Sequence, residues 1–262
     1  MKLGVRGPLP GNTISERAKV LKRTNFDGIE LGHEFLHLSA DDILEQLDGT
    51  DIGVSAIVGS IGLLNTNVKV RRESVEIVKD RLVMAKKLGA SGVIEVPVFG
   101  SPQFLDISPI MSVYDLEWKL LIAGLKELVD QIKETGIPIL IEPLNRYETH
   151  FINRVEQAVD ICKEVGSPKE IKILADLFHM SIEERDITAA LKNGGEYIGY
   201  IHLADSNRME PGAGHTDFTS PIAALKSIGY DGWLTIESGA STETEDALRR
   251  ANDLIRSLWD AS

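Results

Sequence analysis

Four short apolar runs in this sequence each end on a side chain that can bind a metal ion. The runs and the residues that follow them are 139–141 with Glu142, 173–175 with Asp176, 200–201 with His202, and 234–236 with Glu237. Taken singly, a strand-end acid is more often a helix N-cap or an ion-pair partner, and a lone strand histidine is usually a hydrogen-bonded core residue. Four such residues at successive strand ends favour one shared metal site.

The ligand types indicate which ion this site would hold. Three carboxylates packed together repel one another strongly unless a cation lies between them. Oxygen ligands with one imidazole and no thiolate favour Mn²⁺ first, then Mg²⁺ or Co²⁺, with Zn²⁺ less favoured. Open coordination positions on such an ion suit two adjacent oxygens of a ketose, which would lower the pKa of the carbon acid between them.

The surrounding sequence alternates short apolar strands with amphipathic helices. The expected strands are residues 3–5, 26–31, 52–58, 93–96, 138–141, 171–175, 197–203 and 233–236. The expected helices are residues 13–23, 40–47, 70–88, 112–134, 154–166, 187–192, 220–227 and 244–258, with Ser39 as an N-cap and Gly89 as a helix stop. Eight such units predict an α/β fold of the closed (β/α)8 TIM barrel type, in which the carboxyl ends of all strands meet at one face. An open doubly wound sheet is the alternative, but no Gly-x-Gly-x-x-Gly follows the first strand.

Composition narrows the class of protein. The 262 residues are 43% hydrophobic and contain no linker-like or low-complexity tract, which predicts one domain over residues 1–262. The formal net charge of −12 argues against a nucleic-acid partner. No run approaches the roughly 18 apolar residues of a membrane span, and the N-terminus is unlike a signal peptide, so we expect no membrane association and a cytoplasmic location. The single cysteine, Cys162, is expected in the apolar core of a helix.

Three further residues are candidates for binding a substrate near the cluster. His179 follows Asp176 by three residues, Arg208 follows the strand that ends at His202, and Glu148 follows Glu142 by six. Each could bind or orient substrate oxygens, and the alternative for each is a loop ion pair or a cap. Of the remaining histidines, His215 is expected on the rim of the site. His33, His37 and His150 are expected to be structural or to face solvent.

Several motifs together resemble the xylose isomerase-like barrels. They are IEPLNRYE at 141–148, ADLFHM at 175–180, HLADSNR at 202–208, PGAGH at 211–215 and IES at 236–238. Within that superfamily the chain is most similar to the D-tagatose and D-psicose (allulose) 3-epimerase group, a likeness that spans essentially the whole chain.

The resemblance implies a Mn²⁺- or Co²⁺-dependent epimerisation at C3 of a free ketose through a cis-enediolate. It further implies that Glu142 and Glu237 are both metal ligands and the two catalytic bases, one on each face of C3. Asp176 and His202 would only hold the metal. His179 and Arg208 would bind substrate oxygens near C2, with Glu148 behind them. Dimers or tetramers are typical of the group, so a homo-oligomer is expected.

The residues leave several alternatives open. The far end of the sugar would meet early strand-end loops, which offer a varied set: Arg6, Glu30, Ser60 and Phe99. The same superfamily contains hydroxypyruvate isomerases, pentulose-phosphate 3-epimerases, inosose dehydratases and an abasic-site endonuclease. The endonuclease is disfavoured because its zinc site needs histidines where this chain has Val58-Gly59-Ser60 and Val96-Pro97-Val98. A phosphorylated ketose would need an anion pocket, for which residues 239–242 are the candidate. A non-enzymatic metal sensor would require the cluster to be capped by protein.

Overall fold

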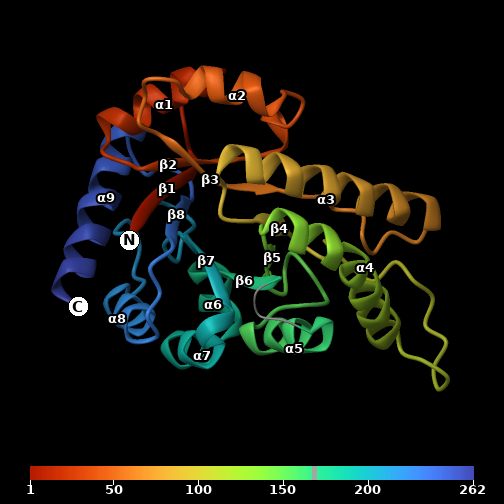
Figure 1. Cartoon of the computed structure of the whole chain (residues 1–262). Helices are drawn as coiled ribbons and strands as arrows, with labels where there is room; N and C mark the ends of the chain where they lie inside the picture. The colour runs from red at the N-terminus through yellow and green to blue at the C-terminus, as the bar shows by residue number, and fades with distance from the viewer. Residues whose placement is uncertain (167–169) are drawn as a thin grey trace.

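Eight parallel strands close into a barrel in the order β1 to β8, with β1 paired to β8 (Figure 1). This computed structural model describes residues 1–166 and 170–262. The strands are β1 (Lys2–Gly7), β2 (Gly28–Leu31), β3 (Gly53–Val58), β4 (Val93–Glu95), β5 (Ile139–Ile141), β6 (Ile171–Asp176), β7 (Ile198–Leu203) and β8 (Trp233–Glu237). The predicted α/β (β/α)8 TIM barrel is therefore confirmed.

Helices follow the strands and cover the outside of the barrel. They are α1 (Ile14–Arg23), α2 (Ala40–Leu47), α3 (Val68–Leu88), α4 (Val113–Thr135), α5 (Val155–Val165), α6 (Leu177–Glu183), α7 (Ile187–Gly194), α8 (Thr219–Ser227) and α9 (Thr244–Ala261), with short 3-10 helices at η1 (His33–Phe35) and η2 (Gly195–Tyr197). Ser39 caps α2 as predicted, because its side chain accepts a hydrogen bond from the Asp42 amide. Gly89 ends α3 in the left-handed conformation with φ 69°, which a glycine adopts without steric cost.

Three elements were not predicted from the sequence: α6, η1 and η2. Helix α6 starts directly after β6, because the Asp176 carboxylate accepts a hydrogen bond from the Phe178 amide at 2.7 Å and so caps the helix. The 3-10 helix η1 follows β2 and brings His33 to the mouth of the barrel. The expected segment 154–166 forms α5, in which Cys162 is fully buried as predicted. Burial raises the pKa of its thiol to about 12.

The two-residue period of the strands separates two apolar layers. Six buried side chains fill the barrel interior: Ala56, Ile94, Leu140, Leu174, Tyr200 and Trp233. Their neighbours along the strands, such as Ile139 and Ile141, belong to the larger cluster between the strands and the helices. The Tyr200 hydroxyl lies 2.7 Å from both Ser55 Oγ and Thr235 Oγ1, so this buried polar group of the interior layer is hydrogen-bonded.

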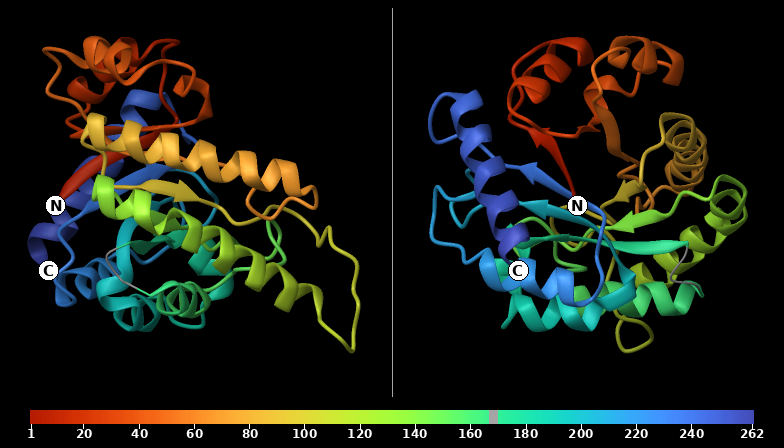
Figure 2. Two further views of the ribbon diagram at one scale, coloured as in Figure 1. Left: turned by 45° about the vertical axis from the view of Figure 1, so that its right-hand side comes forward. Right: turned by 60° about the vertical axis from the view of Figure 1, so that its left-hand side comes forward.

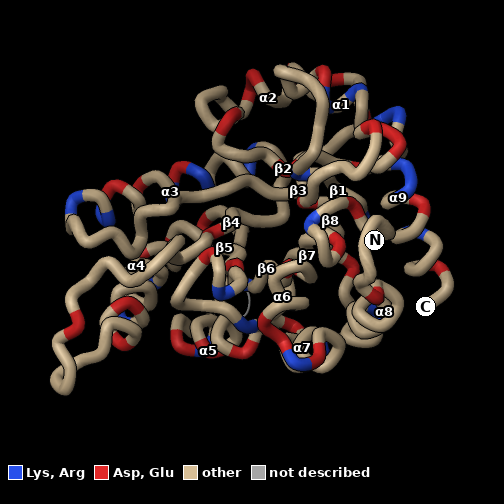
Figure 3. The backbone as a smooth tube through the Cα atoms, turned by 180° about the vertical axis from the view of Figure 1, so that it is seen from behind, with Lys and Arg blue, Asp and Glu red and all other residues tan. Residues whose placement is uncertain are grey.

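The longest helices, α3 and α4, lie side by side along one flank of the barrel (Figure 2). The segment before α4 projects beyond the helices at this flank (Figure 2) and exposes Leu105 and Ile110. Both Lys and Arg and Asp and Glu lie along the outer helices (Figure 3). Within the described residues, no helix has both the length and the apolar character needed to cross a membrane.

Candidate active site

Strand periodicity brings the four predicted ligands to one mouth of the barrel. Residues two positions after the interior layer point to the same side of the strand, at its carboxyl end. Leu140 therefore leads to Glu142, Leu174 to Asp176, and Tyr200 to His202. On β8, Thr235 contacts the interior Tyr200, and Glu237 follows it by two residues.

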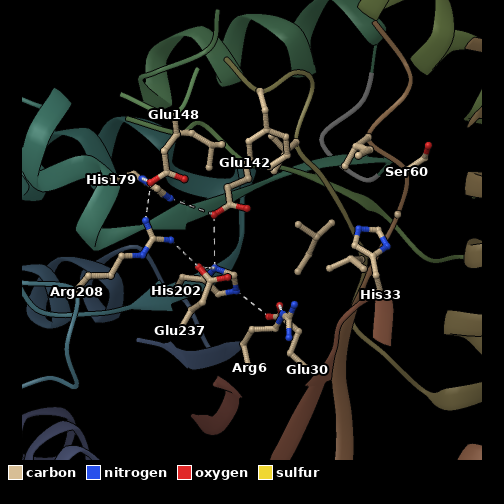
Figure 4. Close-up of a pocket in the computed structure, with 17 residues that line it drawn as sticks. Arg6, Glu30, His33, Ser60, Glu142, Glu148, His179, His202, Arg208 and Glu237 are labelled. Carbon is tan, nitrogen blue, oxygen red and sulfur yellow. Dashed lines mark hydrogen bonds and ion pairs between the residues drawn. The ribbon is translucent and has the colours of Figure 1, made fainter. Parts of the chain in front are cut away.

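The four side chains form one cluster, and Figure 4 labels Glu142, His202 and Glu237 of it. Each offers a ligand atom, and these atoms all lie within 4.8 Å of one another. His202 Nδ1 lies 3.5 Å from Glu142 Oε1 and 3.4 Å from Glu237 Oε2. Glu142, Asp176 and His202 are buried, while Glu237 remains partly accessible from the pocket. The predicted grouping of Glu142, Asp176, His202 and Glu237 is therefore present.

The donor set fits a divalent cation. Among the described residues, Asp176 Oδ2 and His202 Nδ1 are buried without a hydrogen-bond partner, and both face the cluster. Burial, together with the neighbouring charges of Glu237 and Asp176, raises the pKa of Glu142 to about 8, although the nearby His202 imidazole acts to lower it. Buried polar atoms normally have a partner, and a cation would satisfy both orphaned atoms and offset the carboxylate repulsion.

Asp176 is placed for both roles that the sequence offered as alternatives, helix cap and candidate metal ligand. Its Oδ1 accepts the Phe178 amide and so caps α6, while its Oδ2 faces the cluster. This arrangement also places His179 in the first turn of the helix, with Nε2 at 3.5 Å from Asp176 Oδ2 and 3.9 Å from Glu142 Oε1. One short helix therefore presents both a candidate ligand and a candidate substrate-binding residue.

Glu30 on β2 contacts His202 on the side away from the cluster. Its Oε2 is 2.7 Å from His202 Nε2, and its Oε1 is 3.6 Å from Arg6 Nε (Figure 4). A carboxylate that accepts the Nε2 proton leaves Nδ1 to face the cluster, which is the usual support of a metal-binding histidine. This support of His202 was not predicted, and the grouping of Glu30 with possible substrate-end residues stays a prediction, since Glu30 also lines the cavity.

Glu30→Gln is expected to weaken binding of a divalent cation about 10- to 100-fold, because the imidazole loses its anionic support. Titration calorimetry with Mn²⁺ would measure the change. Glu34→Gln is the matched control, since Glu34 binds Arg6 and Arg17 and makes no contact with His202. Equal affinities in wild type, Glu30→Gln and Glu34→Gln would contradict a supporting role for Glu30.

His179 is oriented by Asn145. The side-chain amide of Asn145 lies 2.7 Å from His179 Nδ1, and because Asn145 Nδ2 can only donate, Nδ1 accepts. Burial lowers the pKa of His179, which favours a neutral ring that carries its proton on Nε2. That N–H faces the cluster side and can donate to a substrate oxygen. Asn145 was not predicted to have this role, because its part depends on a contact with a residue 34 positions away.

Arg208 and Glu148 form a pair at the edge of the cluster. Arg208 Nη1 lies 2.6 Å from Glu148 Oε1, and Nη2 lies 3.4 Å from Glu237 Oε2 (Figure 4). The guanidinium also lies over the Phe178 ring, 4.6 Å from its centre. Burial raises the pKa of Glu237, but the charges of His202 and Arg208 outweigh it and lower that pKa to about 2. Glu237 is therefore held as a carboxylate.

A cavity of about 360 Å³ opens above these residues. One side carries Glu148, His179 and Arg208, and the opposite side carries His33 and Ser60 (Figure 4). His33 is exposed, but its place in the cavity wall was not predicted. His150 has the structural role expected, since its Nε2 lies 2.6 Å from the buried carboxylate of Glu117. His215 lies outside this cavity, on a separate surface depression.

Asp205 fixes the loop that carries Arg208. Its carboxylate accepts backbone N–H groups of Ser206, Gly212 and Thr216 at 2.7, 2.9 and 2.9 Å. Burial raises the pKa of Asp205, but these hydrogen bonds outweigh it and lower the pKa to about 2. The charged carboxylate therefore stabilises the loop.

Asp205→Asn is expected to lower the free energy of unfolding by about 1 to 3 kcal/mol at neutral pH, because an amide cannot accept as many N–H donors. The folded pKa of Asp205 is lowered, so the wild-type advantage is present above the unfolded pKa of about 3.9 and is lost as the pH falls towards 2. Urea unfolding of both proteins between pH 2 and 7 measures this. A difference that does not change with pH would contradict the role of the charge.

The candidate anion pocket at residues 239–242 already holds a carboxylate of the chain. The Ser241 amide and hydroxyl donate to Glu210 at 2.8 and 2.6 Å, and Arg250 binds the same carboxylate. Glu210 thus occupies the donors that a phosphate would need. This arrangement disfavours a phosphorylated substrate held at that loop.

Residues 18–258 match the xylose isomerase-like TIM barrel family, and the chain belongs to that family. A 3-dehydro-D-guloside 4-epimerase of Escherichia coli (strain K12) is 27% identical over 249 residues, which cover 93% of this chain and 94% of the relative. An L-ribulose 3-epimerase of Mesorhizobium japonicum is 27% identical over 253 residues, covering 94% and 83%. The crystal structure of an E. coli 3-keto-D-glucoside 4-epimerase matches with a TM-score of 0.87 at 26% identity, covering 98% of this chain and 99% of that one.

Proposed function

We propose that this chain is a divalent-metal-dependent ketose 3-epimerase. The observation that carries the proposal is the position of two carboxylates, Glu142 and Glu237, beside the same ring nitrogen, at 3.5 and 3.4 Å from His202 Nδ1. The relatives support it, because L-ribulose 3-epimerase and 3-dehydro-D-guloside 4-epimerase, by their names, both invert a carbon that lies beside a ketone.

The proposed inversion uses Glu142 and Glu237 as the two acid/base groups. Inverting a carbon by proton exchange needs one group on each face of that carbon. Glu142 follows β5 and Glu237 ends β8, so the two carboxylates approach the cavity from different parts of the barrel rim. One carboxylate takes the C3 proton, and the other, protonated, returns a proton to the opposite face. Proton exchange with solvent then restores the starting states.

Three residues on one side of the cavity would hold the substrate. His179 Nε2–H and Arg208 are the donors we assign to the oxygens near the carbonyl, and Glu148 orients Arg208 through the 2.6 Å ion pair. Arg208 also contacts Glu237 at 3.4 Å, so the donor to the substrate and one of the two acid/base groups are positioned together. The common position of His179, Arg208 and Glu148 on one side of the cavity supports a role in substrate binding for these three residues.

Glu142, Asp176, His202 and Glu237 would hold the cation, and the ligand types favour Mn²⁺, with Co²⁺ or Mg²⁺ next and Zn²⁺ less favoured. When bound, the cation polarises the substrate carbonyl and lowers the pKa of the neighbouring C–H. His202 can serve only if the metal replaces a proton at Nδ1, since the surrounding carboxylates raise the pKa of its imidazole despite burial.

Epimerisation at C4 of a 3-keto-glycoside is the second candidate, and it would use the same groups. The specific observation in its favour is the match to the 3-keto-D-glucoside 4-epimerase, which covers nearly all of both chains. The two candidates differ in the ketone position, C2 or C3, and in whether the sugar carries a glycosidic group. Their shared chemistry is removal of the proton on the carbon beside the ketone.

The test is deuterium exchange in D2O with the Mn²⁺-loaded protein. Free ketoses such as D-fructose and L-ribulose are compared with methyl 3-keto-glucoside, and NMR and chromatography follow exchange and inversion. Deuterium at C3 with formation of the C3 epimer supports the ketose 3-epimerase, whereas exchange only at C4 of the glycoside selects the second candidate. Absence of exchange in all substrates would overturn both and direct attention to isomerisation or dehydration.

A further inference from the structure

Glu95, the last residue of β4, is a fully buried acid outside the metal cluster. Its neighbour Ile94 belongs to the barrel interior, and Ile94 and Val96 line the cavity. Because side chains alternate along a strand, Glu95 points the other way, out of the barrel interior. A carboxyl group in such a place is costly unless it has a specific partner.

The partner of Glu95 is the loop after β3. Glu95 Oε1 accepts the backbone N–H of Ser60 at 2.8 Å, and the Ile94 carbonyl accepts that of Gly59 at 2.8 Å. Gly59, Ser60 and Ile61 line the cavity. Ser60 lies across the cavity from Glu148, His179 and Arg208 (Figure 4). Glu95 therefore contacts the back of the cavity wall that faces the substrate-binding residues.

The fit between Glu95 and Gly59 leaves no room for a side chain. A Cβ atom on Gly59 would lie 1.8 Å from Glu95 Oε1 and 2.7 Å from its carboxyl carbon. The backbone of Gly59 lies outside the left-handed region, so the requirement for glycine comes from this contact and not from φ. The loop and the carboxyl group are thus packed against each other without a gap.

Glu95 also contacts the catalytic side of the cavity through its backbone. Its carbonyl oxygen accepts the N–H of Glu142 at 3.1 Å. Glu95 is therefore hydrogen-bonded to two walls of the cavity. Its side chain binds Ser60 in one wall, and its main chain binds Glu142 in the other. A shift of Glu95 would change the distance between the two walls.

The carboxyl group is suited to a neutral hydrogen-bond acceptor. Burial raises its pKa well above the usual value for a glutamate. Within the described residues, Oε2 has no hydrogen-bond partner. A glutamine has nearly the same shape and keeps a carbonyl oxygen for the Ser60 amide, so it is the conservative replacement.

We infer that Glu95 is a positioning residue, whose side chain fixes the cavity wall at residues 59–61 against which the far part of the sugar binds. The expected change in KM rests on the proposed function, whereas the anchoring of residues 59–61 by Glu95 does not. A purely structural role would lower stability without changing KM. A positioning role changes KM, because it moves a surface that contacts the substrate.

A double-mutant cycle tests the inference with Glu95→Ala, Gly59→Ala and the double variant. Each single variant is expected to raise KM about 3- to 10-fold with kcat changed less than about 2-fold, the range of one lost hydrogen bond. In the double variant the new Cβ meets no carboxyl group, so its KM is expected to rise less than the product of the single effects. KM values that equal wild type, or effects that simply multiply, would overturn the inference.

Two further variants separate positioning from general damage. Glu95→Gln is expected to restore KM to within about 2-fold of wild type, since it retains the acceptor for Ser60. Gly194→Ala is the matched control for a crowded glycine, because its Cβ would lie 2.6 Å from Ile198 Cδ1, away from the cavity. It is expected to change stability only, and an equal rise of KM in Gly194→Ala would overturn the inference.

Hydrogen exchange of the Ser60 amide provides a readout that needs no substrate. Exchange is expected to be at least about 10-fold faster in Glu95→Ala than in wild type and unchanged in Glu95→Gln. If the wild type has no epimerase activity but these exchange rates hold, the proposed function fails and the anchoring of the loop stands. If the Ser60 amide exchanges equally in all three proteins, the inference fails. Should Glu95→Ala not fold, Gly59→Ala and Glu95→Gln still give opposite expected results.

Discussion

Glu237→Gln and Glu142→Gln are each expected to lower kcat by about a thousand-fold or more, measured as epimer formation at saturating Mn²⁺. Each substitution removes an acid/base group and one charged ligand of the cluster at the same time. The size of the effect alone therefore does not separate proton transfer from metal binding. Metal content measured on the purified variants makes that separation.

The C3 epimer that takes up solvent deuterium distinguishes the roles of the two carboxylates better than the loss of kcat does. If one carboxylate serves each face, a variant that retains metal can still remove and return the proton of one epimer without inversion. Glu142→Gln and Glu237→Gln should then incorporate solvent deuterium into opposite C3 epimers. Glu148→Gln is a useful comparison, because Glu148 contacts Arg208 but is not part of the cluster, and a smaller loss is expected. Exchange into the same epimer by both glutamine variants would contradict the assignment of one base to each face.

The fold and the cluster were predictable because they depend on local patterns and on one topological rule. Strand periodicity and the end of each apolar run identified Glu142, Asp176, His202 and Glu237, and barrel closure implies that strand ends meet. The approximate bounds of the strands followed from the same patterns. These inferences did not require knowledge of contacts between individual side chains.

The remaining parts of the site depend on contacts between distant residues. Glu30 was grouped with substrate-end candidates, because nothing in its own strand indicates that it binds His202, 172 positions later. Glu95 drew no prediction, since its partner is a backbone amide 35 positions earlier. Helix α6 was not predicted, because a strand-end aspartate can be either an N-cap or a metal ligand and the sequence does not show that one side chain can be placed for both. One carboxylate oxygen caps the helix and the other faces the cluster, and such a combination is visible only when the side chain is placed.

The charges around the cluster explain why residues such as Glu30 and Arg208 are needed beside it. Burial raises the pKa of Glu142, whereas His202 and Arg208 lower that of Glu237, so two identical side chains have opposite environments. Glu30 adds a further carboxylate on the other side of the imidazole. Several buried acids around one histidine are costly in isolation, and a divalent cation is the group that would make the arrangement favourable.

Removing divalent ions is accordingly expected to abolish turnover and to lower the thermal unfolding temperature. A ligand that binds only the folded state at 100 times its Kd stabilises it by about 2.7 kcal/mol, which corresponds to a shift of roughly 5–10 °C for a chain of this size. Chelator-treated protein, followed by calorimetry while Mn²⁺ is added back, measures both the shift and the recovery of activity.

Asp176→Asn isolates the contribution of the cluster to this shift. Asparagine is as good an N-cap as aspartate, so α6 should be retained while the charged ligand is lost. Asp186→Asn is the matched control, because Asp186 caps α7 by accepting the Ala189 amide at 3.0 Å and is not part of the cluster. The Mn²⁺-dependent rise in unfolding temperature should disappear in Asp176→Asn and persist in Asp186→Asn. If millimolar Mn²⁺ leaves the unfolding temperature of the wild type unchanged, or raises it equally in all three proteins, the four side chains do not form the metal site.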